Sequence, residues 1–189
     1  MRNVVLQFWI SLDGYSCDPG TGLWQVLQEI EDPQQEEYFV ARLRQAGTHI
    51  MGRTTYEGMA QTWPSSDHPV AAPMNDIPKV VFSSTLSAAD WPQSRIARGD
   101  ITGELARLQA EPGGEILAHG GTRFVHSLIQ GGLADEYRLW VMPAAAGGGA
   151  LLFPALDYPL RLRLVGRTAF PSGLLELVYV PARAHVSQA

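Results

Sequence analysis

The segment Met51-Gly52-Arg53-Thr54-Thr55-Tyr56-Glu57 (MGRTTYE) joins a short predicted strand, Thr48–Met51, to a predicted helix over Thr54–Gln61. Gly52 lets the backbone come close to a ligand, and Thr54 and Glu57 have the spacing of a helix capping box. Free N–H groups at the helix start, together with Arg53, predict an anion site. The same residues also fit a plain capped helix that follows a strand.

Two further strand ends carry residues of the same kind. His119-Gly120-Gly121-Thr122-Arg123-Phe124 places adjacent glycines between a strand and a helix, which permits the close approach of a phosphate but also fits a simple turn. Val81-Phe82-Ser83-Ser84-Thr85-Leu86 runs from a strand into hydroxyl residues, which can bind a phosphate or an adenine edge but more often only end a strand. The chain contains neither GxGxxG nor GxxxxGK, so the sequence does not support a standard Rossmann or P-loop site.

Strand-like and helix-like segments alternate along the chain. The segment 33–46 starts at Pro33 and has Phe39, Val40 and Leu43 at helical spacing, with Gly47 as a stop. The alternation predicts an α/β fold with a mostly parallel sheet covered by helices on both faces, and a final hairpin that adds antiparallel strands at one edge. The other predicted segments are strands at Asn3–Leu12, Lys79–Ser83, Glu115–His119 and Glu136–Met142, helices at Asp100–Ala110 and Thr122–Gln130, and hairpin strands at Arg161–Ala169 and Leu174–Val180.

The length of 189 residues predicts a single domain, 1–181, followed by a frayed tail, 182–189. Two long loops, Thr62–Ile77 and Pro143–Pro159, are candidates for substrate contact or for an interface. The hairpin is apolar and lies at a sheet edge, so we expect a homodimer. The residues behind this expectation are Leu162, Leu164, Val165, Leu175, Leu177 and Val178.

Composition narrows the partners and the chemistry. The net charge of −5 and the lack of a basic run disfavour nucleic acid as the main partner. The one cysteine, Cys17, excludes an intrachain disulfide and a multi-cysteine zinc site, and the five histidines are scattered, so no metal is expected. No apolar run approaches the roughly 20 residues of a membrane span, and the first residues lack the features of a signal peptide, so we expect a cytoplasmic protein without membrane contact. Lys79 is the only lysine, which leaves little room for Schiff-base chemistry.

The order and spacing of these motifs resemble the dihydrofolate reductase superfamily. MGRTTYE matches its MGRxTWE-type segment, VFSST its strand-to-loop segment, and HGGTRFVHSLI its glycine-glycine segment. SLDGY, the DEYRL strand and Gly147-Gly148-Gly149 followed by LLFP resemble more closely the riboflavin biosynthesis reductase branch, the RibD C-terminal domain. The resemblance spans about Val4 to Val180, and the ordered set is more specific than any single motif.

The resemblance implies a sheet of about eight strands, with NADPH lying across the carboxyl ends of the strands. It also implies a cis peptide between Gly120 and Gly121. The cofactor-binding residues that it implies are Gly52, Arg53, Thr54 and Thr55 at the phosphates, Ser83 and Ser84 near the 2′-phosphate, and Gly120, Gly121, Thr122 and Arg123 at the pyrophosphate.

Two carboxylates are candidates for the proton donor. Folate reductases, which the chain resembles, carry a carboxylate on the helix before the MGR segment, and the matching position here is Glu36. Glu36 is also one of several acids near a helix start, where the helix dipole favours them without any catalytic role. Asp13 in SLDGY is the second candidate, although an Asp-Gly turn explains it without function.

The chain departs from its relatives at two points. No arginine occurs between Arg53 and Arg95, where folate reductases hold the glutamate tail of their substrate, and the zinc deaminase signature of the bifunctional riboflavin enzyme is missing from the sequence. We therefore expect an NADPH-dependent reductase that transfers hydride to a small heterocycle, a pyrimidine or a pterin, with 5-amino-6-(5-phosphoribosylamino)uracil reduction as the specific alternative. The rival hypotheses are a non-catalytic small-molecule-binding protein and an assembly module on the same scaffold.

Overall fold

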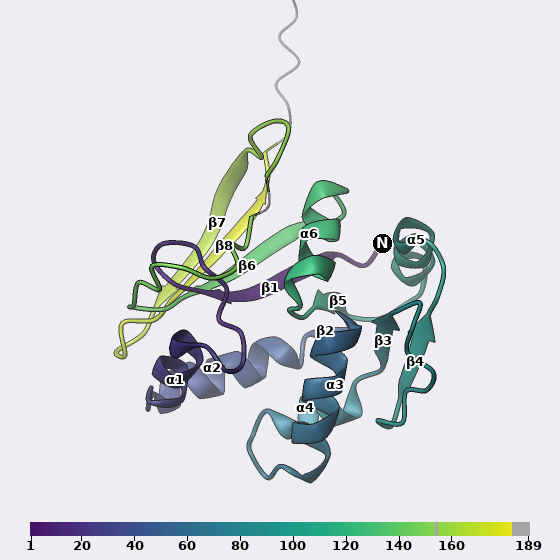
Figure 1. Ribbon diagram of the computed structural model, residues 1–189, viewed down its shortest axis with the longest axis horizontal. Coiled ribbons are helices and arrows are strands. Elements are labelled where there is room, and N and C mark those ends of the chain that lie inside the picture. Colours follow the sequence, from purple (N-terminus) through teal and green to yellow (C-terminus); the bar gives the residue numbers. More distant parts are fainter. Residues whose placement is uncertain (154, 183–189) are drawn as a thin grey trace, which may run out of the picture.

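One eight-stranded sheet organises the molecule, with the strand order β4-β3-β2-β5-β1-β6-β8-β7 (Figure 1). The computed structural model describes residues 1–153 and 155–182. Neighbouring strands from β4 to β6 run parallel, whereas β8 is antiparallel to both β6 and β7. The predicted, mostly parallel sheet with an antiparallel C-terminal hairpin is confirmed. The strands are β1 (Val4–Ile10), β2 (Ala46–Gly52), β3 (Lys79–Phe82), β4 (Ser94–Ala97), β5 (Glu115–Ala118), β6 (Glu136–Val141), β7 (Leu162–Ala169) and β8 (Leu175–Pro181).

Helices cover both faces of the sheet, with α1 to α4 on one face and α5 and α6 on the other (Figure 1). α6 has the predicted bounds, and the other predicted helices differ only at their ends. The helices are α1 (Gly22–Gln28), α2 (Pro33–Leu43), α3 (Arg53–Thr62), α4 (Ala71–Asp76), α5 (Ile101–Ala110) and α6 (Thr122–Gln130), and a short 3-10 helix, η1 (Trp63–Ser65), follows α3.

The sequence does not predict α1, α4 or β4. α1 is seven residues long and fully buries only Leu23, and its apolar positions at helical spacing, Leu23, Val26 and Leu27, are too few to predict a helix. α4 lies inside the predicted loop Thr62–Ile77 and contains Pro73, which argues against a helix when only the sequence is read. β4 has four residues at the sheet edge and exposes Arg95. Short peripheral elements of this kind bury too few residues to leave a periodic pattern.

Buried apolar side chains from the same strands hold both helical layers. On β1 and β2, Leu6 and Ile50 belong to the core under α5 and α6, whereas Val5 and Met51 belong to the core under α2, α3 and α4. A third group, which includes Trp140 of β6, packs against α1 and α2. Because successive residues of a strand point to opposite faces, β1 is apolar on both and appears in the sequence as a continuous apolar run.

A buried ion pair fixes the C-terminal hairpin to α2. Glu176 on β8 is fully buried, and its carboxylate accepts hydrogen bonds from Arg42 Nε at 3.0 Å and Arg42 Nη2 at 2.9 Å. The Tyr38 hydroxyl donates to the same carboxylate at 2.7 Å. A bidentate guanidinium–carboxylate pair specifies orientation as well as contributing energy. The hairpin is therefore held in one position against the helix that carries Glu36.

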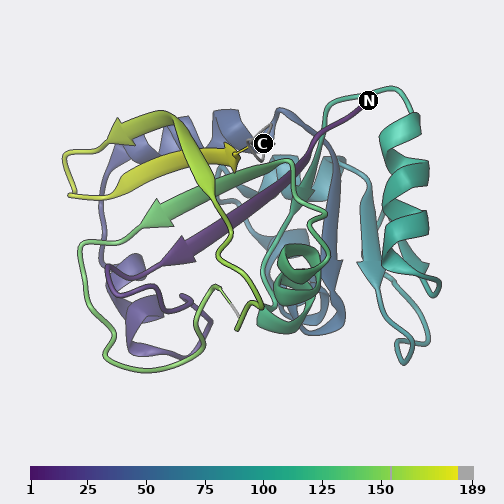
Figure 2. The same cartoon turned by 90° about the horizontal axis from the view of Figure 1, so that it is seen from above.

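The loop that follows β1 is fastened to the loop that follows β6 (Figure 2). Leu12 N donates to the Ala144 carbonyl at 2.8 Å, and Ser16 N donates to the Ala150 carbonyl at 2.7 Å. Tyr15 also forms an antiparallel bridge with a residue of the second loop. The predicted long loop Pro143–Pro159 is thus ordered in part by contacts with the end of β1.

The predicted frayed tail, 182–189, is described only at its first residue. Ala182 donates its N–H to the Arg161 carbonyl at 2.8 Å, and residues 183–189 lie outside the described part of the chain. Within that described part, no helix combines the length and apolar character needed to cross a membrane.

The only lysine of the chain is buried at the start of β3. The Lys79 ammonium is fully buried and donates to the carbonyls of Met74, Asn75 and Ile77, each at 2.9 Å. It also lies 4.5 Å from the ring centroid of Trp91. Burial lowers the pKa of Lys79 from 10.5 to about 8. Because its donors hold the end of α4, Lys79 is a structural residue and not a free nucleophile.

We predict that Lys79→Met destabilises the fold by about 2 kcal/mol, because three carbonyl groups near the end of α4 lose their donor. A thermal melt should then show a midpoint about 4–8 °C lower for a chain of this size. The folded protein releases the Lys79 proton near pH 8, whereas the unfolded chain holds it to about pH 10.5. The unfolding free energy of the wild type should therefore rise across this window relative to that of the variant. Equal midpoints and parallel pH profiles would contradict this role.

Candidate functional site

The carboxyl ends of β2 and β5 lie side by side, and the chain leaves them in opposite directions. β2 continues through α3 and α4 to β3 on one side, whereas β5 continues through α6 to β6, which lies beyond β1. Open α/β sheets bind ligands at such a reversal of strand order. The switch point, as we call it, consists of these two strand ends and the first turns of α3 and α6. It contains both glycine junctions, Gly52–Arg53 and Gly120–Gly121.

The first turns of α3 and α6 are in direct contact. A β-carbon on Gly52 would lie 3.1 Å from Cβ of Phe124, and a β-carbon on Gly121 would lie 2.7 Å from Oγ1 of Thr55. Gly121 also has a φ of +91°, a left-handed conformation that favours glycine. The two helices approach this closely because each junction has a glycine facing the other helix. Packing alone therefore requires glycine at Gly121 and favours it at Gly52, whatever ligand binds at the switch point.

Neither of these helix starts has a side-chain cap among the described residues. Gly52 and Gly121 are the N-cap residues, and neither first turn contains an acid. The carboxylates of Asp32 and Asp100, by contrast, cap α2 and α5. The first N–H groups of α3 and α6 are thus left to bind an anion, and the positive ends of the two helix dipoles reinforce each other there.

The predicted capping box of Thr54 and Glu57 is wrong. α3 begins at Arg53, because Gly52 already takes the N-cap position with an extended backbone. Glu57 pairs instead with Arg53 across one helical turn, at an N–O distance of 3.5 Å and with both side chains nearly half exposed. An exposed pair of this kind contributes little to stability, so the Arg53 guanidinium can turn toward an anion.

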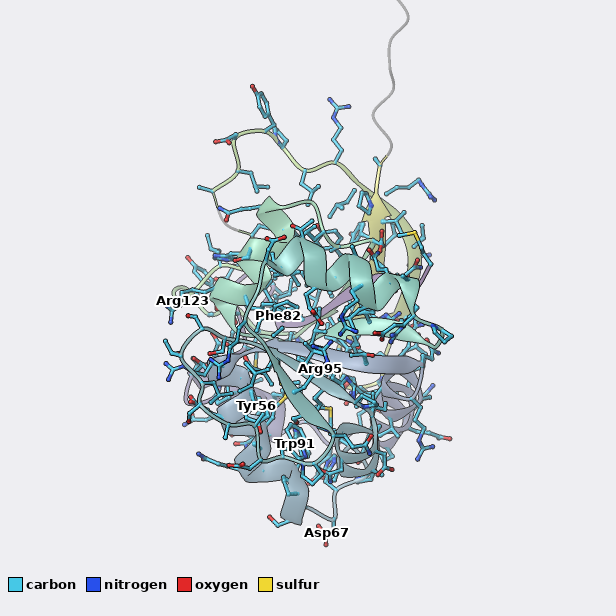
Figure 3. The ribbon with its side chains drawn as sticks, turned by 90° about the vertical axis from the view of Figure 1, so that its right-hand side faces the viewer. Tyr56, Asp67, Phe82, Trp91, Arg95 and Arg123 are labelled. Carbon is cyan, nitrogen blue, oxygen red and sulfur yellow. The ribbon has the colours of Figure 1, made fainter. Side chains whose placement is uncertain are left out.

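An exposed arginine and an aromatic pair border the start of α6. Arg123 projects from the rim of the molecule, and Phe82 lies further inward (Figure 3). Phe82, the last residue of β3, stacks on Phe124 of α6 with ring centroids 5.2 Å apart. The end of β3 is therefore fixed next to the start of α6.

Ser83 and Ser84 follow β3 and lie beside the start of α3, because Phe82 pairs with Gly52 in the sheet. Ser83 Oγ accepts a hydrogen bond from the Leu86 amide at 2.9 Å, which uses an oxygen lone pair and leaves the hydroxyl hydrogen to donate. Ser84 is exposed. The structure thus brings three separate junctions to one end of the sheet, with the predicted cofactor-binding residues Gly52, Arg53, Thr54, Thr55, Ser83, Ser84, Gly120, Gly121, Thr122 and Arg123.

The expected cis peptide between Gly120 and Gly121 is wrong for this structure. No cis peptide bond occurs in the part of the chain that the structure describes. The left-handed backbone of Gly121 makes the turn instead and leads directly into α6 as its N-cap.

Two hollows lie in the described structure, and neither opens between the two helix starts. One, of about 420 Å³, is bordered by α3 and the segment 86–92, including Leu86. Tyr56 and Trp91, which also line it, lie near each other in Figure 3. The Trp91 amide donates to the Tyr56 hydroxyl at 3.0 Å, so these two walls are fixed to each other. The other, of about 190 Å³, lies against α5 and the first residues of β3 and β4. The first hollow includes Tyr56, Glu57 and Leu86, at the ends of two of the three junction segments, but neither hollow is lined by a predicted cofactor-binding residue.

Asp13 anchors a loop. Its carboxylate accepts hydrogen bonds from the Ser11 hydroxyl at 2.5 Å and from the amides of Ala146 at 2.9 Å and Gly147 at 2.8 Å. These bonds, the one from Ser11 first, lower the pKa of Asp13 from 3.8 to about 2. Asp13 is therefore ionised at neutral pH, and it holds the glycine-rich loop after β6 against the end of β1.

Glu36 lies in the first turn of α2 and contacts a different loop. Its carboxylate oxygen is 3.4 Å from Nε2 of His68, in the segment between η1 and α4, and its side chain is 39% exposed. The pair thus connects α2 to the residues before α4 and remains open to solvent. The contacts of Asp13 and Glu36 do not place these two carboxylates in one cluster.

Two histidines that the sequence does not mark as functional form a pair at the base of the switch point. His49 of β2 and His119, which follows β5, are buried, and 2.8 Å separates His119 Nε2 from His49 Nδ1. A signal for them exists in the sequence, because each histidine interrupts an apolar strand shortly before a glycine junction. Their proximity to each other depends on the pairing of β2 with β5.

Related sequences align with nearly the whole length of the chain. The profile of the RibD C-terminal domain family matches residues 2–175. The protein YyaP of Bacillus subtilis (strain 168), itself uncharacterized, is 28% identical over 184 residues, which cover 94% of each chain.

Solved structures share the fold. A protein from Shewanella sp. PV-4 that is named for riboflavin biosynthesis has a TM-score of 0.79 at 23% identity, over 96% of this chain and 99% of that chain. Dihydrofolate reductase from Enterococcus faecalis, solved with NADP(H) and RAB-propyl, has a TM-score of 0.62 at 14% identity, over 95% of this chain and 96% of that chain. At these identities the likeness shows the fold, and the profile match shows the family. The chain belongs to the RibD C-terminal domain family.

Proposed function

We propose that the protein is an NADPH-dependent reductase that transfers hydride to a small heterocyclic substrate. One observation carries the proposal: two uncapped helix starts meet at the switch point of a RibD C-terminal domain, beside Arg53 and Arg123. Paired helix N-termini suit a ligand with two adjacent phosphates. The names of the structural relatives, which include a dihydrofolate reductase solved with NADP(H), support the reductase class.

The residues at the switch point fit the phosphates of this cofactor. Gly120 and Gly121 lack side chains that would cover the main-chain amides, and Thr55 faces the same turn. The amides at the starts of α3 and α6, with Arg53 and Arg123, would hold the pyrophosphate. Ser83 and Ser84 would hold the 2′-phosphate, to which hydroxyl and guanidinium groups donate charge-assisted hydrogen bonds. When bound, NADPH supplies the hydride.

Glu36 is the better of the two candidates for the proton donor. Asp13, with a pKa of about 2, has no proton to give near neutral pH, and its oxygens already hold the loop after β6. Glu36 contacts solvent and His68, either of which can return a proton to its carboxylate between turnovers. The chain's own contribution would then be to hold the substrate near α2 and to pass it a proton from Glu36.

A pyrimidine or a pterin is the substrate class we propose, with a ribosylaminopyrimidine of the riboflavin pathway as the specific alternative. Names among the structural relatives support this class, including a deaminase/5-amino-6-(5-phosphoribosylamino)uracil reductase of Thermotoga maritima, of which this chain covers 57%. A non-catalytic binding protein or an assembly module on the same scaffold is the rival reading. A reductase should oxidise NADPH in the presence of a pterin, a pyrimidine or a quinone, whereas a binding protein or an assembly module should not. The loss of NADPH absorbance measures this oxidation.

We also propose that a second copy of the chain pairs with the edge strand β7. The six apolar hairpin residues divide in the structure: Val178 is buried, Leu162 and Leu177 pack on the core, and Leu164, Val165 and Leu175 remain exposed. β7 ends the strand order, and an apolar edge strand is a ready surface for strand pairing. A two-fold dimer would cover the same strand on both copies.

The first prediction concerns the cofactor. NADPH should bind more tightly than NADH, because only NADPH offers a dianionic 2′-phosphate to Ser83 and Ser84. Gly120→Ala should weaken NADPH binding at least tenfold, about 1.4 kcal/mol, because a methyl group would narrow the space next to the main-chain amides that we assign to the pyrophosphate. Calorimetric titration measures both effects.

Gly121→Ala is the matched comparison for this variant. A β-carbon on Gly120 would meet the Phe8 ring at 3.4 Å, which is an ordinary contact, whereas one on Gly121 would clash with Thr55. The melting temperature should therefore stay near that of the wild type in Gly120→Ala and fall in Gly121→Ala. Unchanged NADPH affinity in a well-folded Gly120→Ala protein would remove the main support for a phosphate site.

The second prediction separates the two carboxylates. Glu36→Gln should lower kcat by about 100-fold and leave the Kd for NADPH unchanged, since a general acid acts on the substrate. Asp13→Asn should instead speed the hydrogen exchange of the Ala146 and Gly147 amides, because they lose a charged acceptor. Stopped-flow kinetics and amide exchange by NMR are the measurements. A Glu36→Gln enzyme with full kcat would exclude Glu36 as the donor.

The third prediction concerns assembly. The wild type should sediment as a dimer at micromolar concentration, and Val165→Asp should sediment as a monomer, because a charge at the exposed edge opposes burial. Thr62→Asp, at an exposed position on α3, is a control with the same added charge. A monomeric wild type, or a dimer that both variants retain, would refute pairing at β7.

A further inference from the structure

We propose that His119 is a positioning residue for the cofactor's pyrophosphate, because its hydrogen bond to His49 fixes the Gly120–Gly121 turn against the start of α3. The inference rests on the proposed function, since it concerns the same site. It gives a role to two buried titratable side chains that are neither predicted cofactor-binding residues nor candidate acids.

The pair lies where β2 and β5 end. His119 directly precedes Gly120, and His49 lies three residues before Gly52. The His119 amide donates to the Ile50 carbonyl at 2.9 Å, which continues the pairing of the two strands up to the glycine turn. The exposed fraction is 0% for His49 and 6% for His119. The last backbone and side-chain bonds of β5 before the turn are therefore both made to β2.

The hydrogen-bond partners determine which ring nitrogens carry protons. His49 Nε2 lies 3.2 Å from the Pro73 carbonyl, and a carbonyl only accepts, so His49 Nε2 must be the protonated nitrogen. In neutral His49 the other nitrogen, Nδ1, is then an acceptor. His119 Nε2, at 2.8 Å, must donate to it. The bonds thus run in one direction, from His119 through His49 to the residue at the third position of α4.

Both rings are neutral in the folded protein. Burial lowers the pKa of His49 to about 4 and lowers that of His119 well below 6.5, and the charges of Lys79 and of the other ring act in the same direction. A neutral pair adds no charge to the phosphate site. Apolar residues of similar volume often replace a buried polar pair without loss of stability, so we assign to the histidines a fixed orientation of the two strand ends.

A fixed orientation matters here because the turn packs closely against α3. A β-carbon on Gly121 would lie 2.7 Å from Thr55 Oγ1, so the β5 end has little room to move toward α3, and movement away separates the two helix starts. The amides of α3 and α6 can bind one pyrophosphate together only while both starts keep their spacing. His119 maintains that spacing from the sheet side, opposite the Thr55 contact.

The test uses three variants and two probes. His119→Leu removes the donor, His119→Gln retains an N–H at a similar reach, and the double variant His49→Leu/His119→Leu removes both polar groups. The probes are NADPH, which contains the pyrophosphate, and adenosine 2′-monophosphate, which lacks it. Calorimetry gives the affinities, and a thermal melt of each variant gives its stability.

We expect His119→Leu to bind NADPH about tenfold more weakly, and to bind adenosine 2′-monophosphate as the wild type does, because only the pyrophosphate end is misplaced. His119→Gln should restore NADPH affinity to that of the wild type. The double variant should melt higher than His119→Leu, since the buried acceptor His49 Nδ1 is gone and the Pro73 carbonyl still accepts from the Ile77 amide at 3.4 Å, yet its NADPH affinity should stay low. That combination separates positioning from a merely structural role.

Three results would overturn the inference. Wild-type NADPH affinity in His119→Leu would show that the turn does not need the bond. Equal weakening of both probes would show a general loss of structure, with the proposed function intact. A wild-type protein that binds neither probe would refute the proposed function, and the role of His119 with it.

Discussion

The contact between the first turns of α3 and α6 is the constraint on which the rest of the site depends. Two helix N-termini carry partial positive charge, so placing them together is unfavourable unless an anion lies nearby. Gly52 against Phe124 and Gly121 against Thr55 enforce this arrangement through packing, and neither helix start has an acid or a side-chain cap in the described structure to relieve it. The fold thus maintains an unfavourable charge distribution that an anionic ligand would neutralise, as strained functional sites commonly do.

Buried or hydrogen-bonded charges hold the elements around this contact. Lys79 fixes the end of α4 beside β3, Glu176 fixes α2 to the hairpin, and Asp13 fixes the loop after β6 to the end of β1. Replacing a buried ion pair by apolar residues of the same volume often leaves stability unchanged or raises it, so such groups are weak evidence of stabilisation. Their shared feature is geometric, because each joins elements that are distant in sequence. We infer that they specify where the borders of the site lie more than they raise the free energy of unfolding.

The sequence predicts those parts of the site that depend on local structure. A glycine at a strand end and a hydroxyl after a strand are local features, which is why the three junctions and the bounds of α6 could be recognised. The start of α3 was mispredicted because Thr54 suits an N-cap, and only the approach of Phe124 shows why Gly52 takes that position. The bond between His49 and His119, and the contact of Asp13 with Ala146, join residues far apart in the chain. No periodicity or spacing in one sequence reveals such pairs.

The contrast between local features and long-range contacts divides the proposed site into two halves, and each half has different sequence requirements. The half we assign to the cofactor is built from residues next to strand ends, where the backbone itself supplies most of the donors, so few side chains are fixed by binding. The half near Glu36 is built from α2, from the segment with His68 and from the hairpin, which are held together by side-chain contacts such as Arg42 with Glu176. Side chains and loops on a constant scaffold can change without disturbing the sheet. The physical expectation is that a chain of this fold keeps one cofactor while its substrate changes, and that the substrate is determined by the residues that a single sequence identifies least well.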